Sequence, residues 1–293
     1  SLTSQINLVC NAICSGSATV TPGGGVLPYS YSWTTAPVQT TATATGLCAG
    51  SYTATITDAN GCTATATVNI TQPPALSTTP TQTNLICNAA CTGVATVVVA
   101  GGTTVPCGGY SYSWAPGGQT TSSITGLCAG GYTVTAPDCI GCTITQSFNI
   151  TQPPLLTASI TAQTNLTCNA SCIGTATVSA VGGTTVPCGG YSYSWNTVPA
   201  QTTITATGLC AQSYTATVTD CNGCTSTAVV TITQPPVLSI TPSQTNLNCN
   251  AVCIGAASVV VSGGTTVPCG GYSYSWAPGG QTTSGITGLC AGG

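Results

Sequence analysis

The chain carries almost no charge. Its 293 residues include no Lys, Arg or His, and the formal net charge of −3 comes from Asp58, Asp138 and Asp220. Without cationic side chains there is no counterion release to favour contact with phosphates, so the composition argues against nucleic acid as a partner. The lack of His and Lys also removes the Ser-His-Asp triad, the phosphate-loop lysine and the Schiff base. We therefore predict that the protein is not an enzyme and has no catalytic residues or cofactor.

The three carboxylates stand in equivalent Asp-x-x-Gly turns, far apart in the sequence. That placement disfavours a catalytic acid–base pair, which needs two groups in one site. Each Asp with nearby carbonyl groups is an alternative calcium ligand, but one carboxylate per turn is few for calcium. We prefer the interpretation that each Asp fastens its own turn by accepting backbone hydrogen bonds, and we predict no metal site.

Long apolar runs are missing as well. No stretch reaches the ~18 apolar residues that a membrane-spanning helix needs, so we predict no membrane insertion. The sequence also has no Met and no basic, signal-like segment at its start. We interpret it as an internal piece of a processed protein.

Internal repetition dominates what the sequence does contain. Four Trp residues, Trp33, Trp114, Trp195 and Trp276, recur every 81 residues, and a Pro-Pro pair closes each complete unit. A period of this size indicates a tandem array of domains. The predicted domains are residues 1–72, 73–152, 153–234 and 235–293, the last of them truncated before its final hairpin.

The clearest element of each unit is a hairpin, seen best in residues 205–236. Apolar and Thr residues alternate from Tyr214 to Thr219, which indicates a strand with one buried and one solvent-facing side. An Asp-Cys-Asn-Gly-Cys turn follows, and a Thr- and Val-rich run returns over Thr225–Thr233. The pattern predicts an antiparallel hairpin.

The rest of the unit reads as further short strands. An opening strand is expected to carry the Asn-Leu-x-Cys-Asn motif (Asn165–Asn169), and a short strand is expected over Gly174–Val178. The aromatic residues of Tyr191–Trp195 share one face, and we prefer a core stripe over a ligand platform. Six or seven short strands in about 80 residues, with no helical period, predict an all-β antiparallel sandwich.

Twenty cysteines at regular spacing, with no His to share a metal site, indicate disulfides formed outside the cytosol. Cys-x-x-Cys pairs such as Cys139/Cys142 and Cys221/Cys224 leave metal or redox chemistry as an alternative. No cationic group is available to lower a thiol pKa there, so we favour disulfides.

Comparison of the repeats suggests the pairing. The first unit has four cysteines and lacks both members of the pairs Cys107/Cys139 and Cys188/Cys221 found in the next two units. Cysteines gained or lost together are expected to bond to each other. The remaining four cysteines of each unit allow three connectivities, of which we favour first-to-last. The predicted bonds are then Cys10–Cys62, Cys14–Cys48, Cys87–Cys142, Cys91–Cys128, Cys168–Cys224 and Cys172–Cys210.

The fourth unit predicts only Cys253–Cys290, because its sequence stops before the Asp-x-x-Gly-Cys turn. Cys249 and Cys269 then have no partner inside the unit. We expect that the natural chain continues past Gly293, with a neighbouring molecule supplying the missing hairpin as the alternative. The Gln-Pro-Pro linkers favour extended backbone, and little slack remains before the next domain, so the prediction is a semi-rigid rod.

The motifs as a set resemble a known family. Gly24–Trp33, with its Pro and Tyr-Ser-Tyr-Ser-Trp, and Gly46–Pro73, which closes on Ile-Thr-Gln-Pro, are similar to the repeats of SprB-type gliding-motility adhesins of Bacteroidota. The resemblance extends with small changes through the later units. It implies Ig-like or PKD-like sandwiches in long cell-surface proteins exported by the type IX system.

These observations favour a structural role. The leading hypothesis is a disulfide-crosslinked stalk of an extracellular adhesin or filament, with other repeats or copies of the chain as partners. The alternative is a binding module, in which exposed Thr rows (Thr53–Thr57 and Thr215–Thr219) contact polysaccharide or, less favoured, ice. Thr is also an ordinary solvent-facing strand residue, and one row per domain does not make a flat array.

Overall fold

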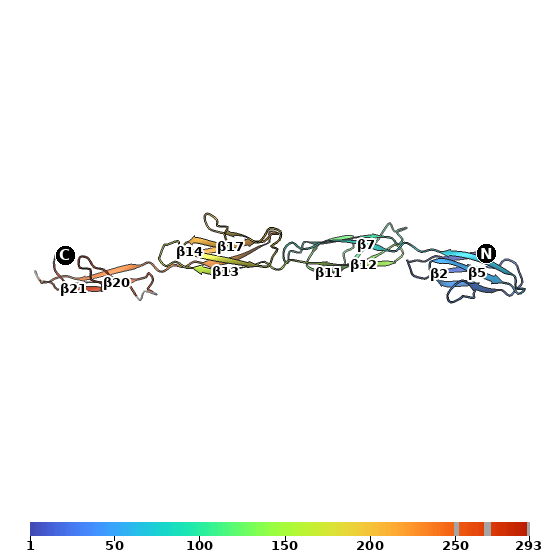
Figure 1. Ribbon diagram of the computed structural model, residues 1–293, viewed down its shortest axis with the longest axis horizontal. Helices are drawn as coiled ribbons and strands as arrows, with labels where there is room; N and C mark the ends of the chain where they lie inside the picture. The colour runs from blue at the N-terminus through green and yellow to red at the C-terminus, as the bar shows by residue number, and fades with distance from the viewer. Residues whose placement is uncertain (249–251, 267–270, 292–293) are drawn as a thin grey trace. The chain divides into compact units, whose positions relative to one another are not determined.

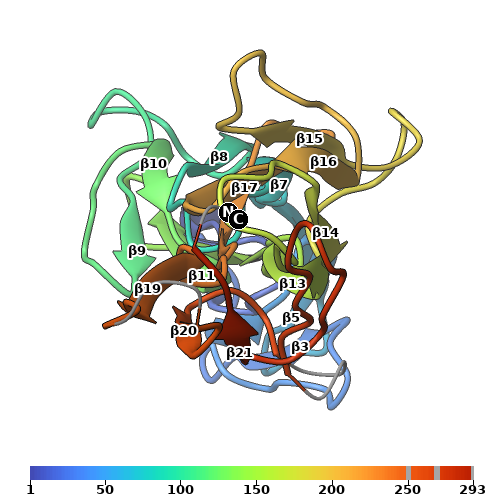
Figure 2. The ribbon, with the colours of Figure 1, turned by 90° about the vertical axis from the view of Figure 1, so that its left-hand side faces the viewer.

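The structure is a computed structural model that describes residues 1–248, 252–266 and 271–291. Every regular element in these ranges is a β-strand, as the labels in Figures 1 and 2 show, which confirms the all-β prediction. The described residues contain no helix long and apolar enough to cross a membrane. By its internal contacts the chain divides into two compact units, Ser1–Gln152 and Pro153–Gly293.

The strands fall into three sets of six and one of three, which we call repeats 1 to 4. Repeat 1 consists of β1 (Leu2–Ile6), β2 (Gly16–Val20), β3 (Ser30–Trp33), β4 (Thr43–Leu47), β5 (Gly50–Thr57) and β6 (Thr63–Ile70). Repeat 2 consists of β7 (Ser77–Thr83), β8 (Gly93–Ala100), β9 (Ser113–Ala115), β10 (Ser123–Leu127), β11 (Gly130–Pro137) and β12 (Thr143–Ile150).

Repeat 3 consists of β13 (Thr157–Thr164), β14 (Gly174–Val181), β15 (Ser192–Trp195), β16 (Thr205–Leu209), β17 (Ser213–Thr219) and β18 (Thr225–Thr231). Repeat 4 has β19 (Ser239–Thr245), β20 (Gly255–Ser262) and β21 (Gly285–Leu289) among the described residues. The exact domain boundaries expected from the sequence remain a prediction.

Each six-stranded repeat is an Ig-like sandwich of two three-stranded antiparallel sheets. In repeat 1 the sheet orders are β1-β2-β4 and β3-β5-β6, and repeats 2 and 3 have the same two orders. The first, second and fourth strands thus form one sheet and the third, fifth and sixth the other, as in the Ig architecture. The third strand also carries a buried Trp, another feature of that architecture.

A tyrosine fixes the start of the fifth strand in each sandwich. The Tyr52 hydroxyl donates to the carbonyl of Cys48 at 3.2 Å, and Tyr132 does the same to Cys128 at 3.2 Å. In repeat 3 the Tyr214 oxygen instead accepts the Cys210 N–H at 3.0 Å. A tyrosine bonded to backbone a few residues upstream is the corner that closes Ig-like folds.

The period-two alternation of the hairpin strands produces the core. In β17 the side chains of Tyr214, Ala216 and Val218 are buried and the Thr residues between them are half-buried. They pack on Trp195, which is 1% exposed and donates its ring N–H to the Thr203 carbonyl at 3.0 Å. Each of the first three repeats has such a core of its own, with Tyr residues half-buried against it, so the predicted aromatic core stripe is confirmed.

One predicted element is wrong. The Asn-Leu-x-Cys-Asn motif was expected on an opening strand, but in repeat 3 it follows the strand β13 and forms a loop. Leu166 is buried there, and its N–H donates to the carbonyl of Thr233 at 2.9 Å. The motif therefore ties the loop to the residues that leave the sandwich, and this contact takes the place of a sheet ladder.

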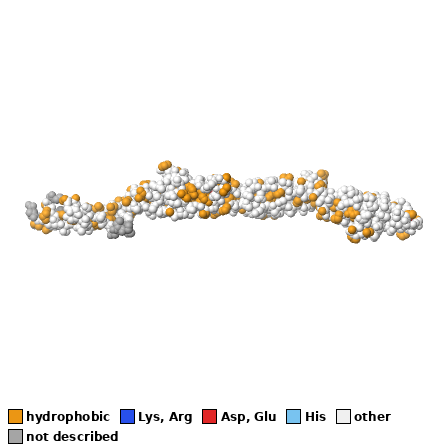
Figure 3. Space-filling view, viewed as in Figure 1, with side chains coloured by type: hydrophobic (Ala, Val, Ile, Leu, Met, Phe, Trp, Pro, Cys, Tyr) orange, Lys and Arg blue, Asp and Glu red, His pale blue; other side chains and the backbone are white. Residues whose placement is uncertain are grey.

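The surface matches the composition. Figure 3 shows hydrophobic side chains scattered among uncharged ones, with no Lys, Arg or His on the face in view. Thr rows contribute to this surface and bond to one another across strands, as the hydroxyls of Thr53 and Thr67 do at 3.1 Å.

Candidate functional site

Disulfides provide the chemistry of this chain. Six disulfides lie within repeats, and all six pairs are among the bonds predicted from the sequence. They are Cys14–Cys48, Cys91–Cys128, Cys107–Cys139, Cys172–Cys210, Cys188–Cys221 and Cys253–Cys290. The described residues contain no group of three or more His, Cys, Asp or Glu side chains placed to hold a metal ion.

The first-to-last pairing is wrong. Cys10 is bonded not to Cys62 of its own repeat but to Cys142 of repeat 2, with the two Cα atoms 5.7 Å apart. The predicted Cys87–Cys142 bond is excluded by the same fact. Cys62 is a free, exposed cysteine.

The third predicted bond of this kind, Cys168–Cys224, is also wrong. Cys168 is free and exposed, whereas Cys224 is disulfide-bonded to another residue, and Cys87 is disulfide-bonded too. The predictions for Cys249 and Cys269 fall on residues outside the described ranges.

The reason for the correction lies in the hairpin geometry. Cys62 sits in the turn between β5 and β6, whereas the loop that holds Cys10 is bonded to residues at the other end of β6. A strand of eight residues is about 26 Å long at 3.3 Å per residue. A disulfide requires Cα atoms within about 7 Å, so Cys10 and Cys62 of one repeat lie too far apart.

The junction between repeats 1 and 2 starts with the loop after β1. Asn7 accepts the Thr71 N–H on its side-chain oxygen at 3.0 Å, and the Leu8 N–H donates to the Thr71 carbonyl at 3.0 Å. Leu8 is buried in the core of repeat 1. These contacts place the next residues of the loop beside the end of β6, where the linker to repeat 2 begins.

The same loop also forms hydrogen bonds with the linker, and we call this set of hydrogen bonds the linker clasp. The Asn11 side-chain amide donates to the Pro73 carbonyl at 2.9 Å, and the Ala12 N–H donates to the side-chain oxygen of Gln72 at 3.0 Å. Ala12 has a φ of 58°, a left-handed conformation that is uncommon for a residue with a side chain. In this conformation the Ala12 N–H points toward Gln72. The Gln of the Gln-Pro-Pro linker is therefore held to repeat 1 by a hydrogen bond.

The clasp is repeated along the chain. Ala89 and Ala170 have φ values of 57° and 58°. Their N–H groups donate to the side-chain oxygens of Gln152 at 2.9 Å and Gln234 at 3.0 Å. Asn169 likewise donates to the Pro235 carbonyl at 2.9 Å. The linkers are therefore held by hydrogen bonds from the repeat that precedes them.

Repeat 2 contributes its Asp turn to the junction. One carboxylate oxygen of Asp138 accepts the N–H groups of Ile140 and Cys142, at 3.1 and 2.9 Å. The other oxygen accepts the Thr103 N–H at 2.9 Å, and the Asp138 N–H donates back to the Cys142 carbonyl at 2.9 Å. The carboxylate therefore fixes the backbone that presents Cys142 to Cys10.

These hydrogen bonds also favour the ionised form of the Asp138 carboxyl group. Burial raises the pKa of Asp138, but the N–H groups of Thr103, Cys142 and Ile140 outweigh it and hold the pKa below the ordinary value of 3.8. In repeat 1 the pKa of Asp58 is lowered as well, with the N–H of Val26 as the largest cause. Both carboxylate oxygens of each Asp are occupied by backbone donors, so the interpretation of the Asp as a turn fastener is confirmed.

A cavity of about 390 Å³ lies at this junction. It is lined by Cys10 and Asn11 of repeat 1, by Pro73 and Pro74 of the linker, and by Asp138 and Cys142 among the residues of repeat 2. The Cys10–Cys142 disulfide, the hydrogen bonds from Asn11 to the linker and the Asp138 turn therefore all border this cavity.

The Thr rows proposed as a binding surface lie in β5 and β17. Their residues are half-buried, and the Thr53 hydroxyl is engaged with Thr67 on the neighbouring strand. Contact with polysaccharide or ice stays a prediction.

Part of the chain is similar to a known repeat family. The SprB repeat family model matches residues 2–38 and 79–119, which include the opening loops and the aromatic strands of repeats 1 and 2. A search of curated proteins finds no match.

Several solved structures share a distant likeness. Three N-terminal domains of the bacteriophage RB49 outer capsid protein Hoc are 16% identical, with 79% of this chain and 97% of that one covered and a TM-score of 0.33. A tetra-tandem repeat from the extending region of a large adhesion protein is 18% identical, with 97% and 89% covered and a TM-score of 0.25. Extracellular domains 3–5 of Drosophila OTK are 11% identical, with 75% and 93% covered and a TM-score of 0.22. These scores are too low to carry an argument.

Proposed function

We propose that the chain is a structural segment of an extracellular, cell-surface adhesin or filament, in which neighbouring Ig-like repeats are joined by disulfides as well as by their linkers. The observation that carries the proposal is the Cys10–Cys142 bond, which crosses from repeat 1 to repeat 2. A bond of this kind changes how a chain of domains responds to tension.

The mechanism follows from the positions of the two cysteines. Cys10 lies near the start of repeat 1 and Cys142 near the end of repeat 2, at a sequence separation of 132. A pull along the chain therefore passes through the sulfur–sulfur bond and bypasses the residues between. The Cys14–Cys48, Cys91–Cys128 and Cys107–Cys139 bonds all lie inside that loop. Repeats 1 and 2 should therefore lengthen little under tension while the crosslink is intact.

The chemistry of the chain supports an extracellular location. Disulfides persist in oxidising compartments outside the cytosol. The chain also contains no Lys or Arg, so trypsin-like proteases have no site at which to cleave it. The SprB-type repeats support a cell-surface adhesin, and type IX export and a gliding role go with that resemblance. The clasped Gln-Pro-Pro linkers support a semi-rigid arrangement of neighbouring repeats. The partners in this proposal are other repeats of the same kind.

Single-molecule pulling on the full chain tests the mechanism. The oxidised chain should extend less than the reduced chain by at least on the order of 400 Å, because reduction releases a loop with a sequence separation of 132 at about 3.4 Å per residue. The double variant Cys10→Ser/Cys142→Ser should lengthen the oxidised chain. Equal extension of the oxidised and reduced wild-type chains would contradict the proposal.

A matched control removes a bond that lies inside the loop. The variant Cys107→Ser/Cys139→Ser should leave the extension of the oxidised chain unchanged, because Cys10–Cys142 already bypasses that segment. Antibody labelling of intact and permeabilised producing cells tests the location. Labelling only after permeabilisation would overturn the extracellular assignment.

A further inference from the structure

Four aliphatic residues lie around the disulfide that joins repeats 1 and 2. Val9 and Ile13 are in the loop after β1, Ile140 is in the Asp138 turn, and Ile144 is in the strand that follows the turn. Their counterparts in repeat 3 are all polar, namely Thr167, Ser171, Asn222 and Ser226. Repeat 3 folds with polar residues at these positions, so the fold of a repeat does not require the aliphatic ones.

These aliphatic side chains are in contact with solvent at the junction. Val9, Ile13 and Ile140 are 48%, 59% and 40% exposed, and Ile144 is half-buried. The Val9 carbonyl lies 3.5 Å from the sulfur of Cys142. Ile13 and Ile144 both line the junction cavity of about 390 Å³, together with the two prolines of the linker. Exposed aliphatic side chains that gather at one place mark interaction sites.

The walls of the cavity are fixed and carry no free charge. The Cys10–Cys142 disulfide and the linker clasp hold the loop of repeat 1, the linker and the turn of repeat 2 together. Asp138 also lines the cavity, but both of its carboxylate oxygens accept backbone N–H groups. A preformed cavity needs little ordering when it is filled. The chemistry of the lining therefore suits an uncharged, apolar occupant.

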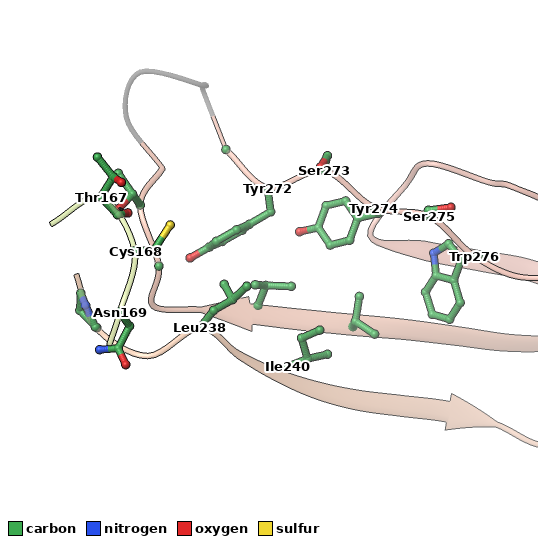
Figure 4. A pocket seen from close by; sticks show the side chains of 16 residues that line it. Thr167, Cys168, Asn169, Leu238, Ile240, Tyr272, Ser273, Tyr274, Ser275 and Trp276 are labelled. Atoms are coloured by element: carbon green, nitrogen blue, oxygen red, sulfur yellow. Dashed lines mark hydrogen bonds between the residues drawn. The ribbon is translucent and has the colours of Figure 1, made fainter. Parts of the chain in front are cut away.

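The groove along repeat 4 is a feature of another kind. It has a volume of about 730 Å³, and Figure 4 shows Leu238 and Trp276 among the residues that line it. Their counterparts in repeat 3, Leu156 and Trp195, are buried. That groove is therefore formed by core positions of a repeat, whereas Ile13 at the junction cavity is exposed in a repeat whose two sheets are both described.

A feature that fits the junction cavity recurs in the first three repeats. The loop before the third strand places an aliphatic residue directly before a proline, and we call these residues the loop tips. They are Leu27, Val105 and Val186, which are 72%, 75% and 74% exposed. Disulfides tie the loops of repeats 2 and 3 to the hairpin turns of the same repeats, and in repeat 1 the Val26 N–H donates to Asp58 at 3.0 Å. A side chain on a fixed loop loses little conformational freedom when it enters a cavity.

We propose that the junction cavity is a self-association site, in which a second copy of the chain inserts a loop tip beside Ile13 and Ile144. The second copy carries the tips, and it carries no cationic side chain. All three Asp carboxylates accept backbone N–H groups. Two copies therefore meet with little repulsion, whereas a charged partner finds no opposite charge at the cavity. Each copy has both a cavity and tips, so two copies contact each other in both directions.

The contact has consequences that differ from those of the proposed stalk. One tip in one cavity buries little surface, so a single contact is weak. Several tips along a tandem array strengthen the association, because each contact raises the effective concentration of the next. The inference goes beyond the stalk, since a stalk of single chains needs no lateral partner. A chain that stays monomeric would overturn the inference and leave the pulling result unchanged.

Sedimentation velocity of the full oxidised chain tests the proposal, with Cys62 and Cys168 alkylated to prevent disulfide-linked dimers. We expect the sedimentation coefficient to rise with concentration. Ile13→Ser/Ile144→Ser introduces the residues found in repeat 3 and should raise the dissociation constant about tenfold or more, because two aliphatic side chains no longer line the cavity. Val98→Ser is the matched control. It also introduces the residue found in repeat 3, at an exposed site of β8 that does not line the cavity, and should change nothing.

Ile13→Ser alone separates association from folding. Ile144 packs partly against the core of repeat 2, whereas Ile13 is the more exposed of the two. The single variant should keep the near-ultraviolet circular dichroism of the wild-type chain and still weaken association. Weakening that appears only together with a loss of that signal would overturn the proposal.

A mixing experiment tests whether the tips are the occupants. The tip variant Leu27→Thr/Val105→Thr/Val186→Thr should associate as weakly as the cavity variant Ile13→Ser/Ile144→Ser. A mixture of the two should associate, because one variant supplies the cavity and the other supplies the tips. Two-colour sedimentation with a different dye on each variant measures the mixed species.

Four outcomes would overturn the proposal. The wild-type chain could be monomeric at every concentration, or the cavity variant could associate as strongly as the wild type. A mixture that forms no mixed species would show that the tips do not enter the cavity. Binding of the uncharged dye Nile red to the cavity of a monomeric chain would assign the cavity to a small apolar ligand instead.

Discussion

Repeats 3 and 4 share nearly the same sequence around their Trp residues but differ in how much of it is buried. In β14 the side chains of Ala176 and Val178 are fully buried, whereas Val259 on β20 is only half-buried. The ring N–H of Trp276 still donates to the Thr283 carbonyl at 2.8 Å, as Trp195 does to Thr203 at 3.0 Å. In the described residues of repeat 4, which form one sheet, the Trp hydrogen bond is kept, whereas the full burial of the Trp ring and the aromatic strand are not.

The difference shows which contacts are local and which are not. The sheet β19-β20-β21 has the same strand order as β13-β14-β16, with no counterpart of β17–β18 among the described residues of repeat 4. The sequence Tyr-Ser-Tyr-Ser-Trp contains the strand β15 in repeat 3, where β17 pairs with it, whereas the same five residues at 272–276 of repeat 4 form no strand. Apolar alternation in a sequence thus predicts which face would be buried, and another sheet decides whether it is.

The largest expected contrast comes from the two Trp residues. Trp195→Ala should destabilise repeat 3 by about 3–5 kcal/mol, because a large, fully buried side chain is lost from a packed core. Trp276→Ala should cost repeat 4 less than half of that, because its ring is already partly in contact with solvent. Urea-dependent hydrogen exchange, read by mass spectrometry on peptides from β13–β18 and β19–β21, measures both changes.

Equal losses in the two repeats would contradict this comparison and would mean that the Trp276 ring is as well packed in solution as the Trp195 ring. Trp195→Phe is the control for repeat 3, because it keeps an aromatic ring in the core and should cost less than Trp195→Ala.

The next contrast concerns pH. In repeat 3, burial raises the pKa of Asp220, but hydrogen bonds from the N–H groups of Thr184, Cys224 and Asn222 hold it below 3.8. Because the pKa is lower in the folded state, the stabilisation is present above the unfolded-state pKa and is lost as the pH falls through the folded-state value. Asp220→Asn should therefore cost about 2 kcal/mol near pH 7 and remove part of the acid sensitivity below about pH 3.8.

Scanning calorimetry between pH 7 and pH 2 tests this expectation, with the repeat 3 transition identified as the one that moves in the variant. The described residues of repeat 4 include no Asp, so its transition should not move. An Asp220→Asn chain that keeps the wild-type acid dependence would show that other groups control it.

Much of the fold could be predicted from the sequence because its signals are local. The alternation from Tyr214, the Asp turn and the Thr-rich return predict the hairpin, and β17 and β18 lie there. The bonded pairs Cys107–Cys139 and Cys188–Cys221 were recognisable because repeat 1 lacks both members.

The crosslink between repeats could not be predicted in the same way. Cys10 and Cys62 have counterparts in both of the next two repeats, so the presence or absence of these cysteines in a repeat does not indicate which cysteine each one bonds. In a tandem array, bonding within a repeat and bonding to the next one have the same sequence pattern. The distinction depends on which end of the hairpin faces the linker. The contact of Leu8 with Thr71 was the missing information.

The smallest effect tests whether repeat 4 is otherwise equivalent to repeat 3. The Tyr191 hydroxyl donates to the Gly182 carbonyl at 2.8 Å, and the Tyr272 hydroxyl donates to the Gly263 carbonyl at 2.6 Å. Both bonds join residues nine positions apart and neither involves the hairpin, so Tyr191→Phe and Tyr272→Phe should each cost about 1 kcal/mol. Hydrogen exchange of the two Gly-Gly turns measures the losses. A much larger loss in repeat 3 would show that the second sheet strengthens even these local bonds.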